Sequence, residues 1–197
     1  MAVSMENIKT LRAMTGAGMM DVKKTLEETD GDLDKAAALL RERGIAKAAK
    51  KADREASEGF VGSYVHHNGK IATLVELNCE TDFVARTEQF QELARNLAIH
   101  VAMADPQVTS RDDVSAEAVE SERSALVNQA REEGKPDNVI DKIVEGRLGK
   151  YYSEVVLLEQ PYIKDDKKTV EQLLKEAVAT LGENIQIGSF ARIAIGS

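Results

Sequence analysis

The sequence contains one set of residues whose types could form a nucleophilic catalytic triad: Cys79, His66 and Asp82. A cysteine activated by a histidine is the nucleophile of thiol hydrolases. Cys79 is the only cysteine of the chain, and it ends an apolar stretch between the other two residues. No oxyanion motif accompanies it, and a single cysteine in a strand is more often a small buried apolar residue. We therefore expect no catalytic residue and no enzyme, and a thiol hydrolase is the alternative.

Gly16-Ala17-Gly18 is the segment that most resembles a phosphate-binding loop. It lacks the third glycine of the dinucleotide fingerprint, and it follows a predicted helix rather than a strand. No glycine-lysine pair of the chain is followed by serine or threonine. One cysteine and three histidines (His66, His67 and His100) do not have the spacing of a structural zinc site. We therefore predict that the chain itself binds no nucleotide, cofactor or metal.

Met19 and Met20 are adjacent apolar residues directly after a glycine-containing turn. Because neighbouring residues point in different directions on a helix, both cannot lie on its inward face. Methionine is frequent at binding surfaces that adapt to a partner. On spacing alone, a second interpretation is equally good: one methionine lies in the core and the other is incidentally exposed.

Thr81-Asp82-Phe83 occupies a predicted strand-to-helix turn. Thr81 or Asp82 could cap the following helix, and Phe83 could pack back onto it as a hydrophobic staple. Propensity and spacing favour this structural role. The same turn would also place an aromatic ring beside a carboxylate on a rigid tip, as in an interface anchor.

The elements that must position these residues begin with three short helices over residues 4–44. Ser4 is a possible N-cap of the first, and Gly44 is a favourable C-terminal residue for the third. Residues 45–58 are rich in alanine, lysine and glutamate and have almost no apolar face, which predicts a solvated linker, helical or frayed. Its local positive charge could contact nucleic acid, but a soluble connector is the favoured interpretation.

From residue 59 the hydrophobic period changes from helical to alternating. Residues 60–66 and 71–78 predict a β-hairpin, with Asn68-Gly69 as a type I′ turn. A helix should follow Phe83 and end before Pro106. Later elements are predicted as helices over 116–133, from Pro136 onward and from Thr169 to Gly182, with a possible short strand over 155–158.

The last predicted strand alternates, with one face carrying Ile185, Ile187, Ser189, Ala191, Ile193 and Ile195. Together these patterns predict an α+β fold. Its parts are an N-terminal three-helix bundle (1–44), a basic linker (45–58) and a core domain (59–197) in which an antiparallel sheet packs against helices.

Composition limits the possible classes of protein. The chain has 197 residues, 43% of them hydrophobic and 30% charged, which is typical of a globular protein. A net charge of −8 argues against a general nucleic-acid surface. One cysteine excludes an intrachain disulfide, and the N-terminus has no secretory pattern. We expect a cytoplasmic protein that has no membrane segment.

Two long stretches, residues 11–26 and 76–86, resemble the two sequence patterns of the elongation factor Ts family. Residues 134–136, 144–147 and 169–176 are also similar to that family, so the resemblance covers essentially the whole chain. It implies a translation factor that exchanges guanine nucleotide on elongation factor Tu. The remaining alternative is a general adaptor, which would bind peptides or ubiquitin-like partners without affecting GDP release.

The resemblance also implies roles for particular residues. The N-terminal bundle would be ubiquitin-associated-like and dock on the GTPase domain of elongation factor Tu, with contacts at Arg12, Met19, Met20 and Lys23. The turn Thr81-Asp82-Phe83 would place Asp82 and Phe83 beside the magnesium and switch region of the partner.

Two further expectations come from the same resemblance. His66, in a Gly-Ser-Tyr-x-His context, would contact the same GTPase domain. Short members of the family are homodimers, and the isoleucine face of the final strand is a plausible dimer edge.

Overall fold

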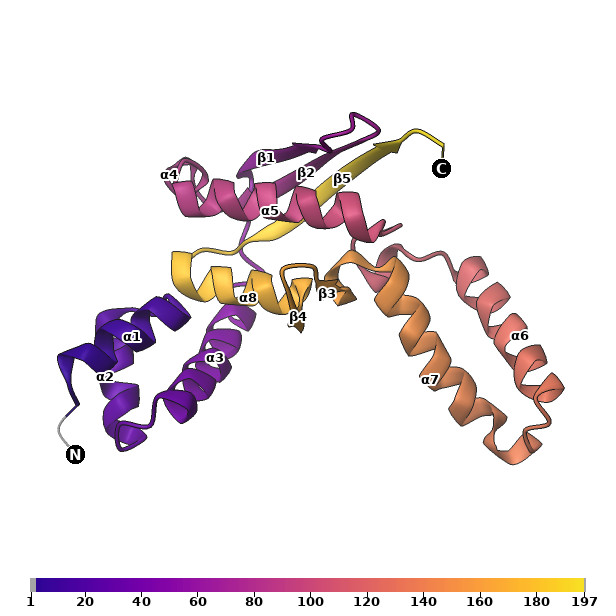
Figure 1. Ribbon diagram of the computed structural model, residues 1–197, viewed down its shortest axis with the longest axis horizontal. Helices are drawn as coiled ribbons and strands as arrows, with labels where there is room; N and C mark the ends of the chain where they lie inside the picture. The colour runs from indigo at the N-terminus through magenta and orange to yellow at the C-terminus, as the bar shows by residue number, and fades with distance from the viewer. Residues whose placement is uncertain (1–2, 197) are drawn as a thin grey trace. The chain divides into compact units, whose positions relative to one another are not determined.

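The computed structural model describes residues 3–196 and confirms the α+β fold (Figure 1). β1, β2 and β5 form an antiparallel three-stranded sheet with the order β1-β2-β5, and β3 pairs with β4. Among the described helices, none has the length and apolar character needed to cross a lipid bilayer. The elements are α1 (Met5–Thr15), α2 (Met19–Glu28), α3 (Leu33–Ala49), β1 (Glu58–Val65), β2 (Ile71–Cys79), α4 (Asp82–Ala85), α5 (Glu88–Ala104), η1 (Arg111–Asp113), α6 (Ala116–Glu132), α7 (Asp137–Val155), η2 (Leu157–Glu159), β3 (Pro161–Tyr162), β4 (Asp165–Thr169), α8 (Val170–Leu181) and β5 (Gln186–Ala194).

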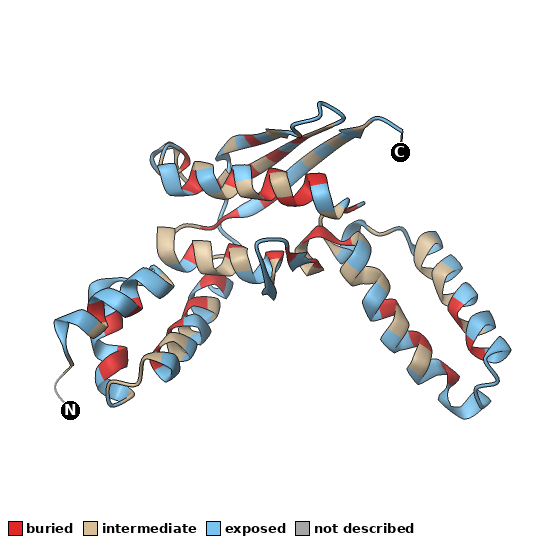
Figure 2. Cartoon of the chain, in the orientation of Figure 1, coloured by how far each residue is buried: buried red, intermediate tan, exposed pale blue. Residues whose placement is uncertain are grey.

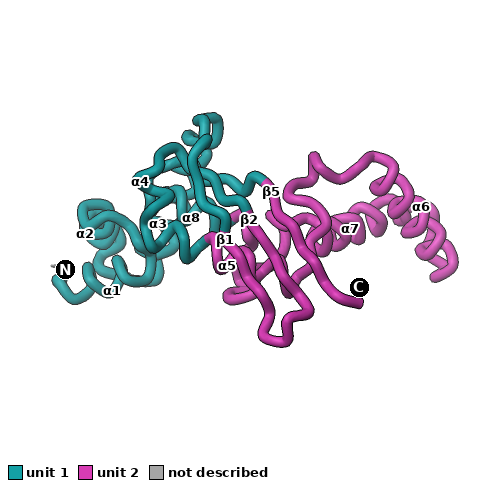
Figure 3. Tube along the Cα trace, turned by 90° about the horizontal axis from the view of Figure 1, so that it is seen from above, with its two compact units in different colours: residues 1–61, 76–93, 172–188 teal, residues 62–75, 94–171, 189–197 magenta. Residues whose placement is uncertain are grey.

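The chain divides into two compact units, each assembled from separate segments (Figure 3). The first unit contains the chain up to residue 61 together with residues 76–93 and 172–188. The second contains residues 62–75, residues 94–171 and the chain from residue 189 onward. Segments that are distant in sequence therefore build each unit.

The three-helix bundle of α1, α2 and α3 lies in the first unit and has its own apolar core. Ser4 is the N-cap of α1, as predicted: its Oγ accepts a hydrogen bond from Asn7 N–H at 3.0 Å. Gly16 ends the helix in the left-handed conformation with φ 65°. The buried core side chains are Ile8, Leu11, Val22, Leu26, Ala36 and Leu40.

The prediction that the third helix ends at Gly44 is wrong, because α3 continues to Ala49. Gly44 lies inside the helix, where a Cβ atom would be 3.1 Å from the Ala179 Cβ of α8. Glycine is therefore present for close helix packing rather than for a left-handed helix end. The segment after α3 is also held, since Asn184 Nδ2 donates to the carbonyls of Ala52 and Arg54 at 3.2 and 2.7 Å.

The β1–β2 hairpin is present, but its turn is not type I′. That turn needs positive φ at both central residues, whereas only Gly69 has it, with φ 69°. Gly69 N–H donates to the His66 carbonyl at 2.8 Å, and His66 N–H donates to the Ile71 carbonyl at 2.8 Å. The Asn68 side chain accepts from Lys70 N–H at 2.9 Å, so asparagine stabilises a longer loop.

Helix α5 covers one face of the sheet, and three contacts within the second unit define that face. Gly62 of β1 lies against Ala94, Thr73 Oγ1 of β2 donates to Ala98 O at 2.7 Å, and Arg192 Nε of β5 donates to Ala102 O at 3.3 Å. The helix predicted after Phe83 and before Pro106 is present as α5, but it begins at Glu88, and the short helix α4 precedes it as a separate element. Thr87 lies between them, and its Oγ1 accepts from Phe90 N–H at 3.3 Å.

Helices α6 and α7 form an antiparallel hairpin in the second unit, and buried residues recur along both helices (Figure 2). The short strand predicted over 155–158 is wrong. α7 runs to Val155, η2 follows, and only Val156 forms an isolated bridge, with Val108. The hairpin core consists of Leu126, Ala130, Ile140, Val144 and Leu148.

The final strand does not keep one apolar face. Ile187 is buried, as is Ile185 just before the strand, whereas Ile193 and Ile195 are 72% and 73% exposed. The side of β5 that is buried therefore changes along its length. Alternation in the sequence cannot reveal such a change, because all four residues occupy odd positions.

His100 of α5 is a fully buried polar residue at the centre of a hydrogen-bond network in the second unit. Its Nδ1 accepts from Ile163 N–H at 3.2 Å, so its Nε2 carries the proton and donates to Gln160 Oε1 at 2.9 Å. Gln160 Nε2 donates to the carbonyls of Ala104 and Glu154. The network joins α5, α7 and the β3–β4 hairpin without an unsatisfied partner among these side-chain atoms.

His100 should make folding stability depend on pH. Burial lowers the pKa of His100 below its ordinary value of 6.5, so the unfolded chain binds the proton more readily. The contribution is complete above about pH 6.5 and is lost as the pH falls, with a slope of up to about 1.4 kcal/mol per pH unit. Thermal unfolding between about pH 7.5 and 5.5 measures it. His100→Gln should weaken this dependence, and equal slopes for wild type and His100→Gln would contradict the assignment.

Candidate protein-binding site

The turn that leads into α4 is built on Thr81. Thr81 has extended backbone angles, and its Oγ1 accepts from Val84 N–H at 3.4 Å, so Thr81 rather than Asp82 is the N-cap. Asp82 Oδ2 instead pairs with Arg86 Nη2 at 2.9 Å. Ala85 is buried and attaches the short helix to the first unit.

Phe83 is 79% exposed at this turn, so the prediction that it packs back as a staple is wrong. Full burial of a large apolar side chain would stabilise the fold by roughly 1.5–3 kcal/mol. Because Phe83 is exposed, the fold gains little of this stabilisation from it. An exposed aromatic ring beside a carboxylate is suited to insertion into a partner. We call Asp82 and Phe83 the wedge.

Glu183 holds the residues directly before the wedge through hydrogen bonds. Glu183 was not among the site residues predicted from the sequence. Its Oε2 accepts from the N–H groups of Glu80 and Thr81 at 3.1 and 3.0 Å, and its Oε1 accepts from Thr81 Oγ1 at 2.6 Å. The sequence offers only a weak signal for this role, namely a carboxylate directly after the glycine that ends a predicted helix. In the structure Gly182 ends α8 with φ 83°.

Cys79 lies fully buried beneath the same turn. Its Sγ donates to the Thr81 carbonyl at 3.2 Å. Burial, with the charge of Glu183 as a smaller cause, raises the pKa of the Cys79 thiol, which keeps it protonated. A protonated, buried thiol is a poor nucleophile, so the site does not favour the thiol hydrolase. Within residues 3–196 no three His, Cys, Asp or Glu side chains are grouped to hold a metal ion.

The three-helix bundle carries a second set of exposed side chains. Met19 and Met20, at the start of α2, are 49% and 78% exposed, so the interpretation that one of them lies in the core is wrong. Arg12 on α1 and Lys23 on α2 are also exposed, and Lys23 pairs loosely with Glu27 at 3.9 Å. Met19 and Lys23 are four residues apart on α2, so an apolar and a cationic side chain share one face of that helix.

His66 lies in the second unit, whereas the other predicted contact residues lie in the first. Its Nδ1 is 2.8 Å from the Tyr64 hydroxyl, and its ring centroid is 4.2 Å from that of His67. The half-buried ring is therefore oriented by the tyrosine two residues earlier. Gly62, in the same segment, lets β1 approach α5 closely.

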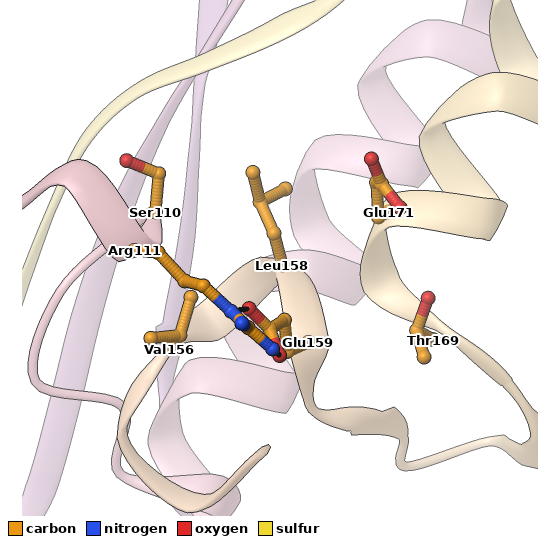
Figure 4. A pocket seen from close by; sticks show the side chains of 7 residues that line it. All are labelled: Ser110, Arg111, Val156, Leu158, Glu159, Thr169 and Glu171. Atoms are coloured by element: carbon orange, nitrogen blue, oxygen red, sulfur yellow. Dashed lines mark hydrogen bonds and ion pairs between the residues drawn. The ribbon is translucent and has the colours of Figure 1, made fainter. Parts of the chain in front are cut away.

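A cavity of about 390 Å³ lies in the second unit (Figure 4). The Arg111 side chain extends along it, with Nη2 donating to Glu159 Oε2 at 2.6 Å and the guanidinium 4.3 Å from the centre of the Tyr152 ring. The ion pair raises the pKa of Arg111 and satisfies its charge, so this cation does not make the cavity an anion site. The lining residues are Ser110, Arg111, Val156, Leu158, Glu159, Thr169 and Glu171.

An α+β fold that exposes methionines on a helical bundle and an aromatic wedge on a capped turn defines a candidate partner-binding protein. The family model described as elongation factor TS matches residues 2–197. Elongation factor Ts of Nitratidesulfovibrio vulgaris is 54% identical over 197 residues, covering 100% of this chain and 98% of the relative. That of Thermosipho melanesiensis is 53% identical over 194 residues, covering 98% and 99%.

The chain belongs to the elongation factor Ts family. Members of this family are in general translation elongation factors and nucleotide-exchange partners of elongation factor Tu.

Proposed function

We propose that this protein promotes GDP release from elongation factor Tu by inserting Asp82 and Phe83 beside the magnesium and switch region of that GTPase. The observation that carries the proposal is the exposure of Phe83 on a turn whose backbone is fixed by Thr81 and Glu183. A rigid aromatic side chain loses little conformational freedom on insertion. The wedge therefore needs no large rearrangement before it contacts the partner.

The bundle supplies the second contact of the proposal. Arg12, Met19, Met20 and Lys23 are exposed, and we assign them to docking on the GTPase domain. Flexible methionine side chains adjust to an uneven apolar surface of a partner. Arg12 and Lys23 favour a partner surface that carries acidic side chains. His66, oriented by Tyr64, is assigned to a further contact with the same domain.

Linkage provides the mechanism of exchange. A protein that binds the nucleotide-free GTPase more tightly than the GDP-bound form must weaken GDP binding by the same factor. A coupling free energy of roughly 5 kcal/mol would shift both affinities by nearly four decades. No covalent step is required, so the residues act through binding alone.

Release of fluorescent GDP from elongation factor Tu, chased with excess unlabelled GDP, tests this proposal. The protein should accelerate release, and the acceleration should saturate as its concentration rises. A general adaptor would bind without changing the rate. Binding at saturating concentration with no acceleration would therefore reject the exchange mechanism and favour the adaptor.

We further propose that the protein is a homodimer that uses the sheet face opposite α5. The residues of β1, β2 and β5 that face α5 alternate with exposed apolar residues of the second unit. Val65, Leu74 and Ile193 are all more than half exposed on that opposite face, and Ile195 continues it. An apolar sheet face is suited to pairing with a second copy of itself. In such a dimer one subunit could supply the wedge and the other His66.

Ile193→Glu should convert the dimer into a monomer, because it places a charge in the centre of an apolar interface. Sedimentation equilibrium at micromolar concentration should give twice the 21.5 kDa of one chain for the wild type and one chain mass for the variant. Ile163→Glu, at an exposed position outside the three-stranded sheet, is the matched control and should remain dimeric. A monomeric wild type would exclude this part of the proposal.

A further inference from the structure

We propose that Glu183 is a positioning residue for the wedge and that exchange depends on it through Phe83. This inference rests on the proposed exchange function. Glu183 lies in the loop between α8 and β5, about a hundred residues beyond the turn that it holds, with a sequence separation of 102 from Thr81. It reaches the turn through three hydrogen bonds, two from backbone N–H groups and one from the Thr81 hydroxyl.

The wedge needs external support because its own helix is very short. α4 has only 4 residues, and a helix of one turn does not stabilise itself in water. Phe83 is exposed and therefore contributes little burial that could fix the turn. The buried Ala85 is a small anchor. The conformation of Asp82 and Phe83 therefore depends on neighbouring residues, both those that follow α4, such as Arg86, and those that precede it.

Glu183 holds the two residues before the wedge, Glu80 and Thr81, by accepting three hydrogen bonds from them. A carboxylate that accepts hydrogen bonds from two consecutive backbone N–H groups restrains the backbone between them, here at Glu80 and Thr81. By accepting from the Thr81 hydroxyl, Glu183 also orients the Oγ1 lone pair toward Val84 N–H, so it supports the N-cap itself.

Asn184 connects the same turn to the segment that follows α3, the last helix of the bundle. Its backbone N–H donates to Glu80 Oε1 at 2.7 Å, and its side chain, 3% exposed, donates to the carbonyls of Ala52 and Arg54. Arg54 Nη1 also lies 3.4 Å from Glu80 Oε1. The pair Glu183-Asn184 thus holds the base of the wedge and the end of the bundle segment in one network.

This arrangement predicts a specific kinetic effect. Docking through the bundle should not depend on the conformation of the wedge, whereas stabilisation of the nucleotide-free partner should. Glu183→Ala should therefore lower the maximal rate of GDP release by about tenfold or more, and change the half-saturating concentration by less than about threefold. Glu183→Gln, whose amide oxygen can still accept from Glu80 and Thr81 N–H, should recover part of the rate.

The test combines these variants with Phe83→Ala and with Glu133→Ala as the matched control. Glu133 also accepts two hydrogen bonds, from Arg147, but lies in the α6–α7 hairpin, and its removal should not change exchange. Adding Glu183→Ala to Phe83→Ala should produce no further loss. A wild-type maximal rate in Glu183→Ala would overturn the inference, and so would a loss of equal size in the Phe83→Ala background.

Amide hydrogen exchange separates failure of this inference from failure of the proposed function. In the free protein, Glu183→Ala should remove the protection of the Glu80 and Thr81 amides, while amides of the bundle core remain protected. If the wild type did not accelerate GDP release, the exchange function would fail even with this protection change present. Unchanged protection at both amides would overturn the positioning role whatever the kinetics.

Discussion

Phe83→Ala is expected to lower the maximal rate of GDP release by at least roughly 30-fold, the equivalent of about 2 kcal/mol for an interface hot spot. Phe83 is exposed in the free protein, so truncation removes no core packing and should leave the unfolding temperature within about 1 °C. The combination separates a functional from a structural role. A folding residue would lose stability and activity together, whereas Phe83 should lose activity alone.

Saturation kinetics of fluorescent GDP release and thermal unfolding on the same samples measure this result. Val139→Ala, at an exposed apolar position of α7, is the control for loss of surface hydrophobicity and should retain the wild-type rate. Phe83→Leu should be intermediate, because it keeps apolar volume but not the planar ring. Equal rates for wild type and Phe83→Ala would show that the wedge does not drive exchange.

Gly62→Ala is expected to destabilise the protein by about 3 kcal/mol, the upper part of the range for overpacking a well-packed site. A Cβ atom at Gly62 would lie 2.9 Å from the Ala94 Cβ and closer still to the Ala94 carbonyl. Because most of the obstruction is helix backbone, no rotamer change can relieve it. Strand β1 would have to move away from α5, which would also disturb the segment that carries His66.

Urea unfolding monitored by circular dichroism measures the loss, and Gly146→Ala is the matched control. Gly146 lies in the exposed interior of α7, where nothing lies within 4 Å of an added Cβ. There alanine should raise the free energy of unfolding by roughly 0.5 to 1 kcal/mol through its higher helix propensity. The same substitution should thus have opposite signs at the two glycines, and equal effects would contradict the assigned close contact.

Local signals predicted the elements that depend on neighbouring residues. Ser4 begins the first helix as its capping chemistry indicates, and Gly134 ends α6 with φ 72°. The β1–β2 hairpin follows from alternation and from the glycine in its loop. The α+β fold and the family were also accessible, because residues 11–26 and 76–86 are contiguous patterns.

Two of the errors concern residues whose role depends on a distant part of the chain. Gly44 has the residue type of a helix end, yet it lies inside α3 and permits this helix to approach Ala179 of α8. The isoleucines of β5 alternate regularly, yet Ile187 is buried and Ile193 exposed, because burial depends on which element covers each part of the strand. Periodicity reports that a strand has two faces and not where its covering ends.

Thr81-Asp82-Phe83 shows the same division most clearly. The order of residues predicts that a capped strand-to-helix turn lies here and that it matches a family pattern. The folded chain adds that Thr81 is the cap, that Phe83 faces solvent and that Glu183 holds the turn from the loop after α8. Capping acts over three residues and is visible in sequence, whereas the Glu183 contact joins residues separated by 102 positions and arises only when the chain is folded.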